Sequence, residues 1–385
     1  MSDFSFSNRT NWSAQNNPLS VAVEALQSQG QEILDLTESN PTRCGFNYPL
    51  DLLNLLSDRS NLTYAPIAKG TLEARQAIVD YYAQRKLSIS AEDLVLTSST
   101  SEGYSFLLKL LTNAGDHVLI PQPCYPLFQF LLELHDVEFD YYPLVYQGQW
   151  RIDQEAFKAL ITPRTRCVIL VNPNNPTGSF LAQQDRDFLN QICQKNNLSI
   201  ISDEVFLDYS LEPAAVSSSL INNHEAPSFV LSGVSKILGL PQMKLSWIAV
   251  RGPESFTQAA LEKLEIIADT YLSVNTPVQN ALACWLAQSQ DIQDQIIGRV
   301  RENLKILTQQ QLDTFSVEGG WYAIIKLPAG RSEEDTVLEL LKQERLLVHP
   351  GYFFDFPDEG YLVVSLLPQS NLFQKGINKL LKVIV

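Results

Sequence analysis

The lysine at position 236 is the residue of this chain best placed for covalent chemistry. It lies in the segment 232–244, directly after the apolar run 228–231, which predicts a buried strand. Small and hydroxyl-bearing residues surround it, so we expect its amine to be desolvated, and desolvation lowers the pKa of a lysine. A neutral amine can attack a carbonyl carbon and form a Schiff base. An exposed loop lysine is the alternative, and this segment alone does not decide between the two.

A run of four hydroxyl residues, SSTS at 98–101, offers a second kind of chemistry. It follows a predicted strand at 93–97 and precedes an apolar helix at 104–111. Free N–H groups and the positive end of the helix dipole make such a helix start a natural anion site. An ordinary helix cap, with Glu102 in a capping box, is the alternative, but it accounts for only one or two of the four hydroxyls.

Strands and helices alternate regularly through the middle of the chain. This alternation predicts an α/β fold with a mainly parallel sheet that has helices on both faces. Ligands of such sheets lie beyond the carboxyl ends of the strands, which is where the serine run, the turn at 172–178, Asp203 and Lys236 fall. The expected strands are at 117–120, 137–142, 167–171, 198–202, 229–231 and 247–250, and the helices between them are at 127–134, 154–161 and 183–194.

The C-terminal part of the chain predicts a smaller α/β unit. Its strands are expected at 321–326, 346–349 and 361–365 and its helices at 333–341 and 372–381, and we place the domain change in a long helix at 290–309. We therefore expect an N-terminal arm and small-domain segment at 1–45, a large cofactor-binding domain at 46–290 and a small domain at 291–385. The first segment would hold a helix at 21–29 and a short strand at 32–36.

Composition excludes several classes of function. A chain of 385 residues, 45% of them hydrophobic, is long enough for two or three domains with stable cores. A net charge of −15 without a basic tract disfavours nucleic acid and anionic membranes as partners. The start of the chain lacks the pattern of a secretion signal, and no apolar run is long enough to span a membrane. Five scattered cysteines without a CxxC pair indicate reduced thiols in the cytoplasm and no metal site.

Three segments together resemble the class I/II aminotransferases of fold type I, which depend on pyridoxal 5'-phosphate. They are NPNNPTG at 172–178, SDEV at 202–205 and SGVSK at 232–236, and their order and spacing agree with that family over residues 20–385. The resemblance implies an aspartate aminotransferase-like enzyme, with a large domain, a smaller C-terminal α/β domain and an obligate homodimer that has its sites at the interface. No G-x-G-x-x-G or phosphate-loop motif supports a nicotinamide or nucleotide enzyme.

The resemblance also implies a role for each candidate residue. Lys236 would form the Schiff base with the cofactor aldehyde and then move a proton between substrate and cofactor, while Asp203 would keep the pyridine nitrogen protonated. Asn175 would donate to the phenolate oxygen, and Tyr125 would stack on the ring. The phosphate would be held by the remaining cofactor-binding residues, namely Ser99, Thr100, Ser101, Ser235, Lys244 and, from the neighbouring subunit, Tyr64.

Three positions depart from the family pattern. Lys244 stands where an arginine is usual, so it keeps the charge but not the bidentate geometry. Phe206 stands where a tyrosine usually donates to the phenolate oxygen. Val363, in the last strand of the small domain, holds the place of the arginine that binds the substrate carboxylate. Our hypothesis is that Arg43, near the expected entrance, replaces that arginine.

The predicted function is the transfer of an amino group from an amino donor to a 2-oxo acid. Carbon–sulfur β-elimination, decarboxylation and racemisation use the same scaffold and remain open, because a fold does not determine a reaction. A non-catalytic binding protein is a third possibility, but it would need neither Lys236 nor the electron sink that Asp203 supports. The sequence does not identify the amino donor or the acceptor.

Overall fold

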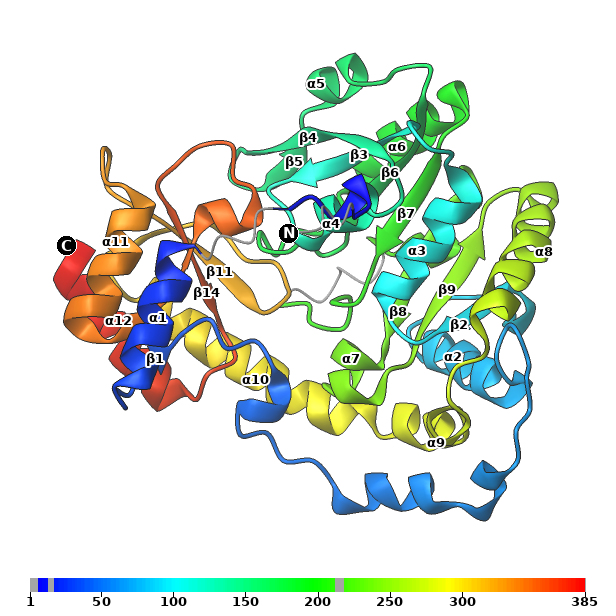
Figure 1. Cartoon of the computed structure of the whole chain (residues 1–385), viewed down its shortest axis with the longest axis horizontal. Coiled ribbons are helices and arrows are strands. Elements are labelled where there is room, and N and C mark those ends of the chain that lie inside the picture. Colours follow the sequence, from blue (N-terminus) through cyan, green and yellow to red (C-terminus); the bar gives the residue numbers. More distant parts are fainter. Residues whose placement is uncertain (1–5, 13–16, 212–217, 385) are drawn as a thin grey trace, which may run out of the picture.

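The computed structural model describes residues 6–12, 17–211 and 218–384 of the chain. Figure 1 shows a large unit built on one sheet and a smaller unit beside it, with the long helix α10 (Ser289–Thr308) running between them. We still propose domain boundaries at 45/46 and 290/291. Among the described residues, no helix has both the length and the apolar character that crossing a membrane requires.

The large unit contains an eight-stranded sheet with the order β2-β9-β8-β7-β6-β3-β4-β5. The five strands from β8 to β4 are parallel, whereas β2, β9 and β5 pair with their neighbours in the antiparallel sense. The prediction of an α/β fold with a mainly parallel sheet is therefore confirmed, although β5 was not expected. The strands are β2 (Leu94–Thr97), β3 (His117–Gln122), β4 (Glu138–Tyr146), β5 (Trp150–Ile152), β6 (Thr165–Val171), β7 (Ser199–Asp203), β8 (Ser228–Gly233) and β9 (Ser246–Arg251).

The antiparallel direction of β9 follows from the connection that precedes it. Between β8 and β9 the chain forms only the one-turn helix α7 (Val234–Ile237) and the 3-10 turn Pro241–Met243. A connection without a long crossover helix keeps the chain at one edge of the sheet, so the next strand runs back. As a result, Lys236 lies at the carboxyl edge of the sheet.

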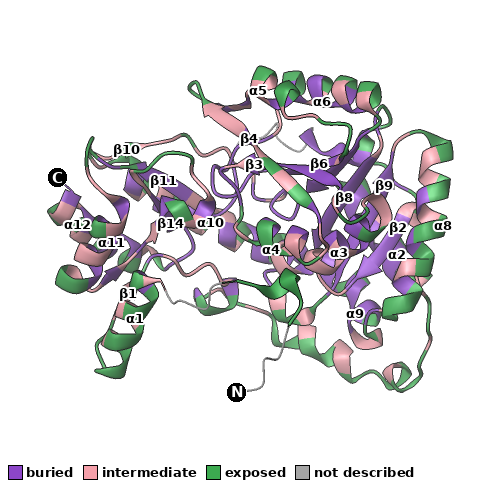
Figure 2. Ribbon diagram, turned by 45° about the horizontal axis from the view of Figure 1, so that its top comes forward, coloured by how far each residue is buried: buried purple, intermediate pink, exposed green. Residues whose placement is uncertain are grey.

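Alternating side chains of the strands build two cores, one on each face of the large sheet. In β6, Val168 and Leu170 join one core, and Cys167 and Ile169 join the other, as the period of two requires. The first core is closed by α2 (Leu72–Gln84), α5 (Gln154–Ala159), α6 (Gln183–Asn196) and α9 (Thr276–Ala287). The second is closed by α3 (Thr100–Leu111), α4 (Leu127–Glu133) and α8 (Glu254–Tyr271). Figure 2 shows the buried residues concentrated in these strands and in the inner faces of the helices.

The small unit has a four-stranded antiparallel sheet with the order β10-β11-β14-β13. Its strands are β10 (Asp313–Thr314), β11 (Tyr322–Lys326), β13 (His349–Pro350) and β14 (Tyr361–Ser365), and its helices are α11 (Glu333–Glu339) and α12 (Ser370–Ile384). The N-terminal strand β1 (Leu34–Asp35) pairs in parallel with β12 (Leu346–Leu347), so the segment with α1 (Pro18–Ser28) packs on this unit. The single strand expected at 346–349 is thus divided between two sheets.

Candidate active site

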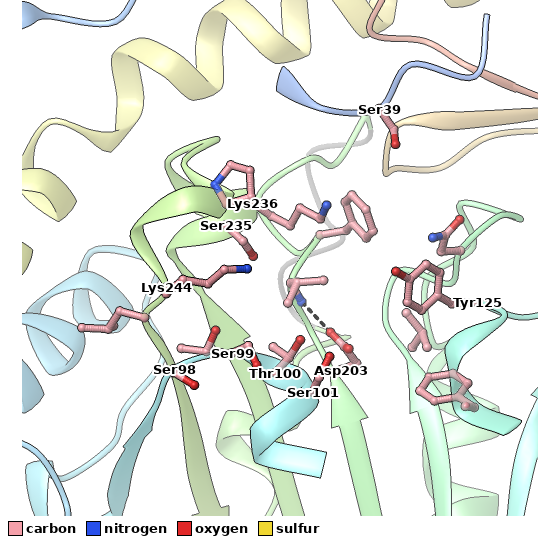
Figure 3. A pocket seen from close by; sticks show the side chains of 18 of the residues that line it. Ser39, Ser98, Ser99, Thr100, Ser101, Tyr125, Asp203, Ser235, Lys236 and Lys244 are labelled. Carbon is pink, nitrogen blue, oxygen red and sulfur yellow. Dashed lines mark hydrogen bonds between the residues drawn. The ribbon is translucent and has the colours of Figure 1, made fainter. Parts of the chain in front are cut away.

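A cavity of about 310 Å³ lies at the edge of the large sheet where the parallel strands end. Nine of the ten predicted site residues line it: Ser99, Thr100, Ser101, Tyr125, Asn175, Asp203, Ser235, Lys236 and Lys244. They come together because the carboxyl ends of β2, β3, β6, β7 and β8 meet at this edge (Figure 3). The tenth residue, Tyr64, is 68% exposed on the surface and does not line the cavity.

The backbone around Lys236 is held by contacts with three other parts of the chain. Gly233 packs so closely on β9 that an added Cβ would lie 2.2 Å from the Ser246 hydroxyl oxygen. The hydroxyl of Tyr209 donates to the Lys236 carbonyl at 2.5 Å, and the Gln293 amide donates to the Ile237 carbonyl at 3.0 Å. These contacts fix the start of the lysine side chain relative to the sheet.

The environment of the Lys236 amine favours its neutral form. Burial lowers its pKa from 10.5 to about 8, although the nearby charge of Asp203 acts in the opposite direction. The amine nitrogen lies 4.9 Å from the ring centre of Trp321 and 5.3 Å from that of Phe206. An amine with a pKa near 8 is partly deprotonated at neutral pH and can act as a nucleophile or a base.

Asp203 closes the opposite wall of the cavity at the end of β7. Burial raises the pKa of its carboxyl group from 3.8 to about 6, although two hydrogen bonds and the charge of Lys236 act to lower it. The bonds come from the Tyr104 hydroxyl at 3.1 Å and the Val205 N–H at 3.2 Å. Above pH 6 this carboxylate is ionised and can hold a proton on a ring nitrogen. The role of Tyr104 was not predicted, although it lies three residues after Ser101 and therefore on the same side of α3.

The first turn of α3 provides an anion site. The Ser99 hydroxyl oxygen caps the helix by accepting from the Glu102 N–H at 3.1 Å, and its carbonyl accepts from the Gly103 N–H at 3.0 Å. The backbone N–H groups of Thr100 and Ser101 lie in the first turn of the helix, where no carbonyl of the helix can accept from them. Both residues line the cavity. The helix cap and the anion site are thus compatible, since the cap uses one hydroxyl of the run.

Two further features fit the cavity to pyridoxal phosphate. The side-chain oxygen of Asn175 is buried and has no hydrogen-bond partner within the described part of the chain, so it can accept from a bound group, while the NH2 group of the same amide is the part that could donate. Lys244 brings a positive charge to the end of the cavity near Ser99 and adopts a φ of 53°, which is uncommon for residues other than glycine (Figure 3). The cation and the helix start suit a phosphate, the carboxylate suits a pyridine nitrogen and the amine suits an aldehyde.

Two polar residues that line the cavity from outside the large sheet were not among the predicted site residues. Ser39 lies in the turn after β1, and Tyr322 begins β11 in the small unit; both line the cavity, and the Ser39 hydroxyl acts to lower the pKa of the Tyr322 phenol. Figure 3 shows Ser39 on the far side of Lys236 from Lys244. The turn residues ESNP at 38–41 are a sequence signal for Ser39, and the aromatic pair at 321–322 is one for Tyr322, but neither indicates that the two residues meet.

Arg43 does not contribute to this cavity. It ends the 3-10 turn Pro41–Arg43, its side chain is 75% exposed and pairs with Glu38 at 3.9 Å, and it lines a separate surface groove. The hypothesis that Arg43 replaces the carboxylate-binding arginine is therefore wrong, because the turn directs its side chain away from Lys236. Val363 is fully buried in an apolar cluster.

Comparisons with known proteins agree with this geometry. The family model for aminotransferase class I and II matches residues 11–374. Glutamate-pyruvate aminotransferase AlaA of Haemophilus influenzae is 28% identical, with coverage of 94% of this chain and 93% of the relative. Alanine aminotransferase of Mycobacterium tuberculosis is 27% identical, with coverage of 94% and 88%.

Solved structures of aminotransferases are also similar to this chain. An aminotransferase from Escherichia coli has a TM-score of 0.88 and 25% identity, with coverage of 100% of this chain and 98% of that one. Alanine aminotransferase from Pyrococcus furiosus has a TM-score of 0.89 and 21% identity, with coverage of 99% of both chains, and so supports the fold. The chain belongs to the class I and II aminotransferases and is a transaminase that depends on pyridoxal phosphate.

Proposed function

We propose that this transaminase moves the amino group of alanine to a 2-oxo acid in the cavity around Lys236. One observation carries the proposal: Lys236 and Asp203 line the same cavity, and burial moves their pKa values to about 8 and about 6. At neutral pH a fraction of the Lys236 amine is neutral and can act as a base, while the Asp203 carboxylate is ionised and can hold a proton at a ring nitrogen. Alanine is chosen because relatives of this chain are named for alanine or pyruvate.

The residues around the cavity have separate tasks in this proposal. When bound, pyridoxal phosphate supplies an aldehyde that reacts with amines and a ring that accepts electrons. The Lys236 amine takes a proton from the substrate α-carbon and returns it during the transfer. Asp203 would hold a proton at the ring nitrogen, Asn175 would donate to the phenolate oxygen and Tyr125 would stack on the ring. The phosphate is bound by Ser99, Thr100, Ser101, Ser235 and Lys244.

We also propose that two copies of the chain form a homodimer in which Tyr64 reaches the phosphate of its partner. Leu50, Leu53, Leu62 and Tyr64 are exposed on consecutive 3-10 turns and loops next to α9. A group of large apolar side chains in one exposed segment is typical of an interaction surface. Tyr64→Phe should weaken binding of pyridoxal phosphate while leaving the mass of the dimer unchanged in light scattering.

We place the enzyme in the cytoplasm. All five cysteines are free, and four of them are buried. Free thiols are typical of proteins in a reducing compartment.

Product analysis with one donor tests the proposed reaction. With L-alanine and 2-oxoglutarate, the expected products are pyruvate and glutamate in equal amounts, and Lys236→Ala should form neither. D-alanine as the product would indicate racemisation, and ethylamine would indicate decarboxylation. Pyruvate and ammonia formed from L-cysteine, without transfer from alanine, would indicate β-elimination. Any of these three results would overturn the proposed function.

A further inference from the structure

The cavity has few basic side chains. Among the described residues that line it, the basic ones are Lys236 and Lys244. Lys244 lies at the end with Ser99, which is the proposed phosphate site, and Lys236 is the proposed base (Figure 3). The residues outside the description, 1–5, 13–16, 212–217 and 385, include no lysine, arginine or histidine. Among the described residues that line the cavity, none beyond these two lysines offers a cation for the substrate headgroup.

The strand position that holds an arginine in the family pattern is apolar in this chain. Val363 lies in the middle of β14, where it is paired with Ile324 on one side and His349 on the other. It is fully buried and clusters with Trp150, Ile324 and Phe354. Val363 therefore supplies no charge to the cavity, and its apolar surroundings suit the valine.

Hydroxyl groups lie at the end of the cavity opposite the phosphate site. Ser39 and Tyr322 come from the N-terminal segment and from β11, and both line the cavity. Burial raises the pKa of Tyr322 to about 12, so this phenol stays neutral and keeps its proton at physiological pH. Each hydroxyl can both donate and accept a hydrogen bond.

We propose that Ser39 and Tyr322 form a neutral headgroup subsite, which binds the group attached to the substrate α-carbon by hydrogen bonds and without an ion pair. The inference rests on the proposed function, because it assigns one end of the same cavity. A guanidinium binds a carboxylate in a bidentate, charge-assisted way and therefore selects for negative charge. A pair of hydroxyls binds a carboxylate, a carboxamide or a hydroxymethyl group with similar affinity. The substrates of this subsite are accordingly amino acids together with their amides and amino alcohols.

Three donors that differ only in the headgroup test the proposal: L-alanine, L-alaninamide and L-alaninol. Each is titrated into the holoenzyme, and the dissociation constant and the rate of the first half-reaction are read from the absorbance of the bound cofactor. The three dissociation constants should agree within tenfold. A preference for L-alanine of more than 100-fold would overturn the proposal, because it would reveal a cation at the headgroup, supplied by the partner subunit.

Two variants test the hydroxyls themselves. Tyr322→Phe and Ser39→Ala should each raise the dissociation constant of all three donors at least fivefold without changing the affinity for pyridoxal phosphate. Tyr361→Phe is the matched control, because Tyr361 begins the neighbouring strand β14 and does not line the cavity. Unchanged donor affinity in Tyr322→Phe and Ser39→Ala would overturn the assignment.

The proposed function and this inference fail in different ways. If alanine reacts and the other two donors do not, the proposed function stands and the neutral subsite is refuted. If the protein binds pyridoxal phosphate and none of the three donors alters its spectrum, alanine transamination is refuted and the subsite proposal falls with it.

Discussion

Replacing Asp203 by asparagine should make the cofactor-free protein more stable at pH 8. Burial at the end of β7 raises the pKa of this carboxyl group from 3.8 to about 6. Because the folded protein then binds the proton more tightly than the unfolded chain, stability falls as the pH rises from about 4 through about 6. Asparagine removes the ionisation and keeps one oxygen, which can accept from the Val205 N–H, while its NH2 group can donate to the Tyr104 hydroxyl oxygen in place of the second bond.

The size of this effect follows from the two pKa values. A shift of about 2 units, at about 1.4 kcal/mol for each unit, corresponds to about 3 kcal/mol of lost unfolding free energy at pH 8. At pH 5 the folded carboxyl group is mostly protonated, and the loss is about 1.5 kcal/mol. The asparagine variant should therefore gain about 3 kcal/mol over the wild type at pH 8 and about half of that at pH 5.

Urea unfolding of the cofactor-free protein at pH 5 and pH 8 measures both numbers. Asp187→Asn, on the exposed side of α6, is the matched control and should change stability by less than about 0.5 kcal/mol. Equal stability of wild type and Asp203→Asn at pH 8, or a larger gain at pH 5 than at pH 8, would refute the reasoning. Excess pyridoxal phosphate should then favour the wild type, because a ligand stabilises the protein that binds it more tightly.

Three further substitutions probe the walls of the cavity. Gly233→Ala would bring its Cβ to 2.2 Å from the Ser246 hydroxyl oxygen, so it should cost about 1–3 kcal/mol in urea unfolding and weaken cofactor binding. Lys244→Met should raise the dissociation constant of pyridoxal phosphate at least tenfold in a fluorescence titration, because it removes the cation from the phosphate site. Tyr104→Phe removes a hydrogen bond that lowers the pKa of Asp203, so the pH-dependent loss of stability should move above pH 6 in urea unfolding measured across pH.

The part of the site that lies on the large sheet could be predicted from the sequence. The serine run, Asp203 and Lys236 each follow an apolar strand, and in an alternating α/β pattern such strand ends meet at one edge. This inference needs only the order of the elements. It does not need the strand direction, which is why the antiparallel return of β9 left the placement of Lys236 and Lys244 unaffected.

The part contributed by the small unit could not be predicted in the same way. Ser39 reaches the cavity because β1 pairs with β12, and Tyr322 reaches it because β11 lies beside β14. Pairing between strands so distant in the chain is set by tertiary packing, which local periodicity does not encode. The error at Arg43 has the same cause, since nearness in sequence to Ser39 does not determine which way a side chain leaves a 3-10 turn.

Charge is divided unevenly along the cavity, and this division links stability to specificity. Asp203, Lys236 and Lys244 all lie on the large unit, where burial makes the first two unfavourable in their charged forms. The free energy of burying these charges is offset when a ligand with a phosphate and a basic ring binds in the cavity. Ser39 and Tyr322 impose no comparable cost, since a neutral hydroxyl carries no charge for burial to destabilise. In the arrangement that we propose, the charged groups of the cavity serve the cofactor and the substrate headgroup is bound by hydrogen bonds, which is the condition for binding acids, amides and alcohols alike.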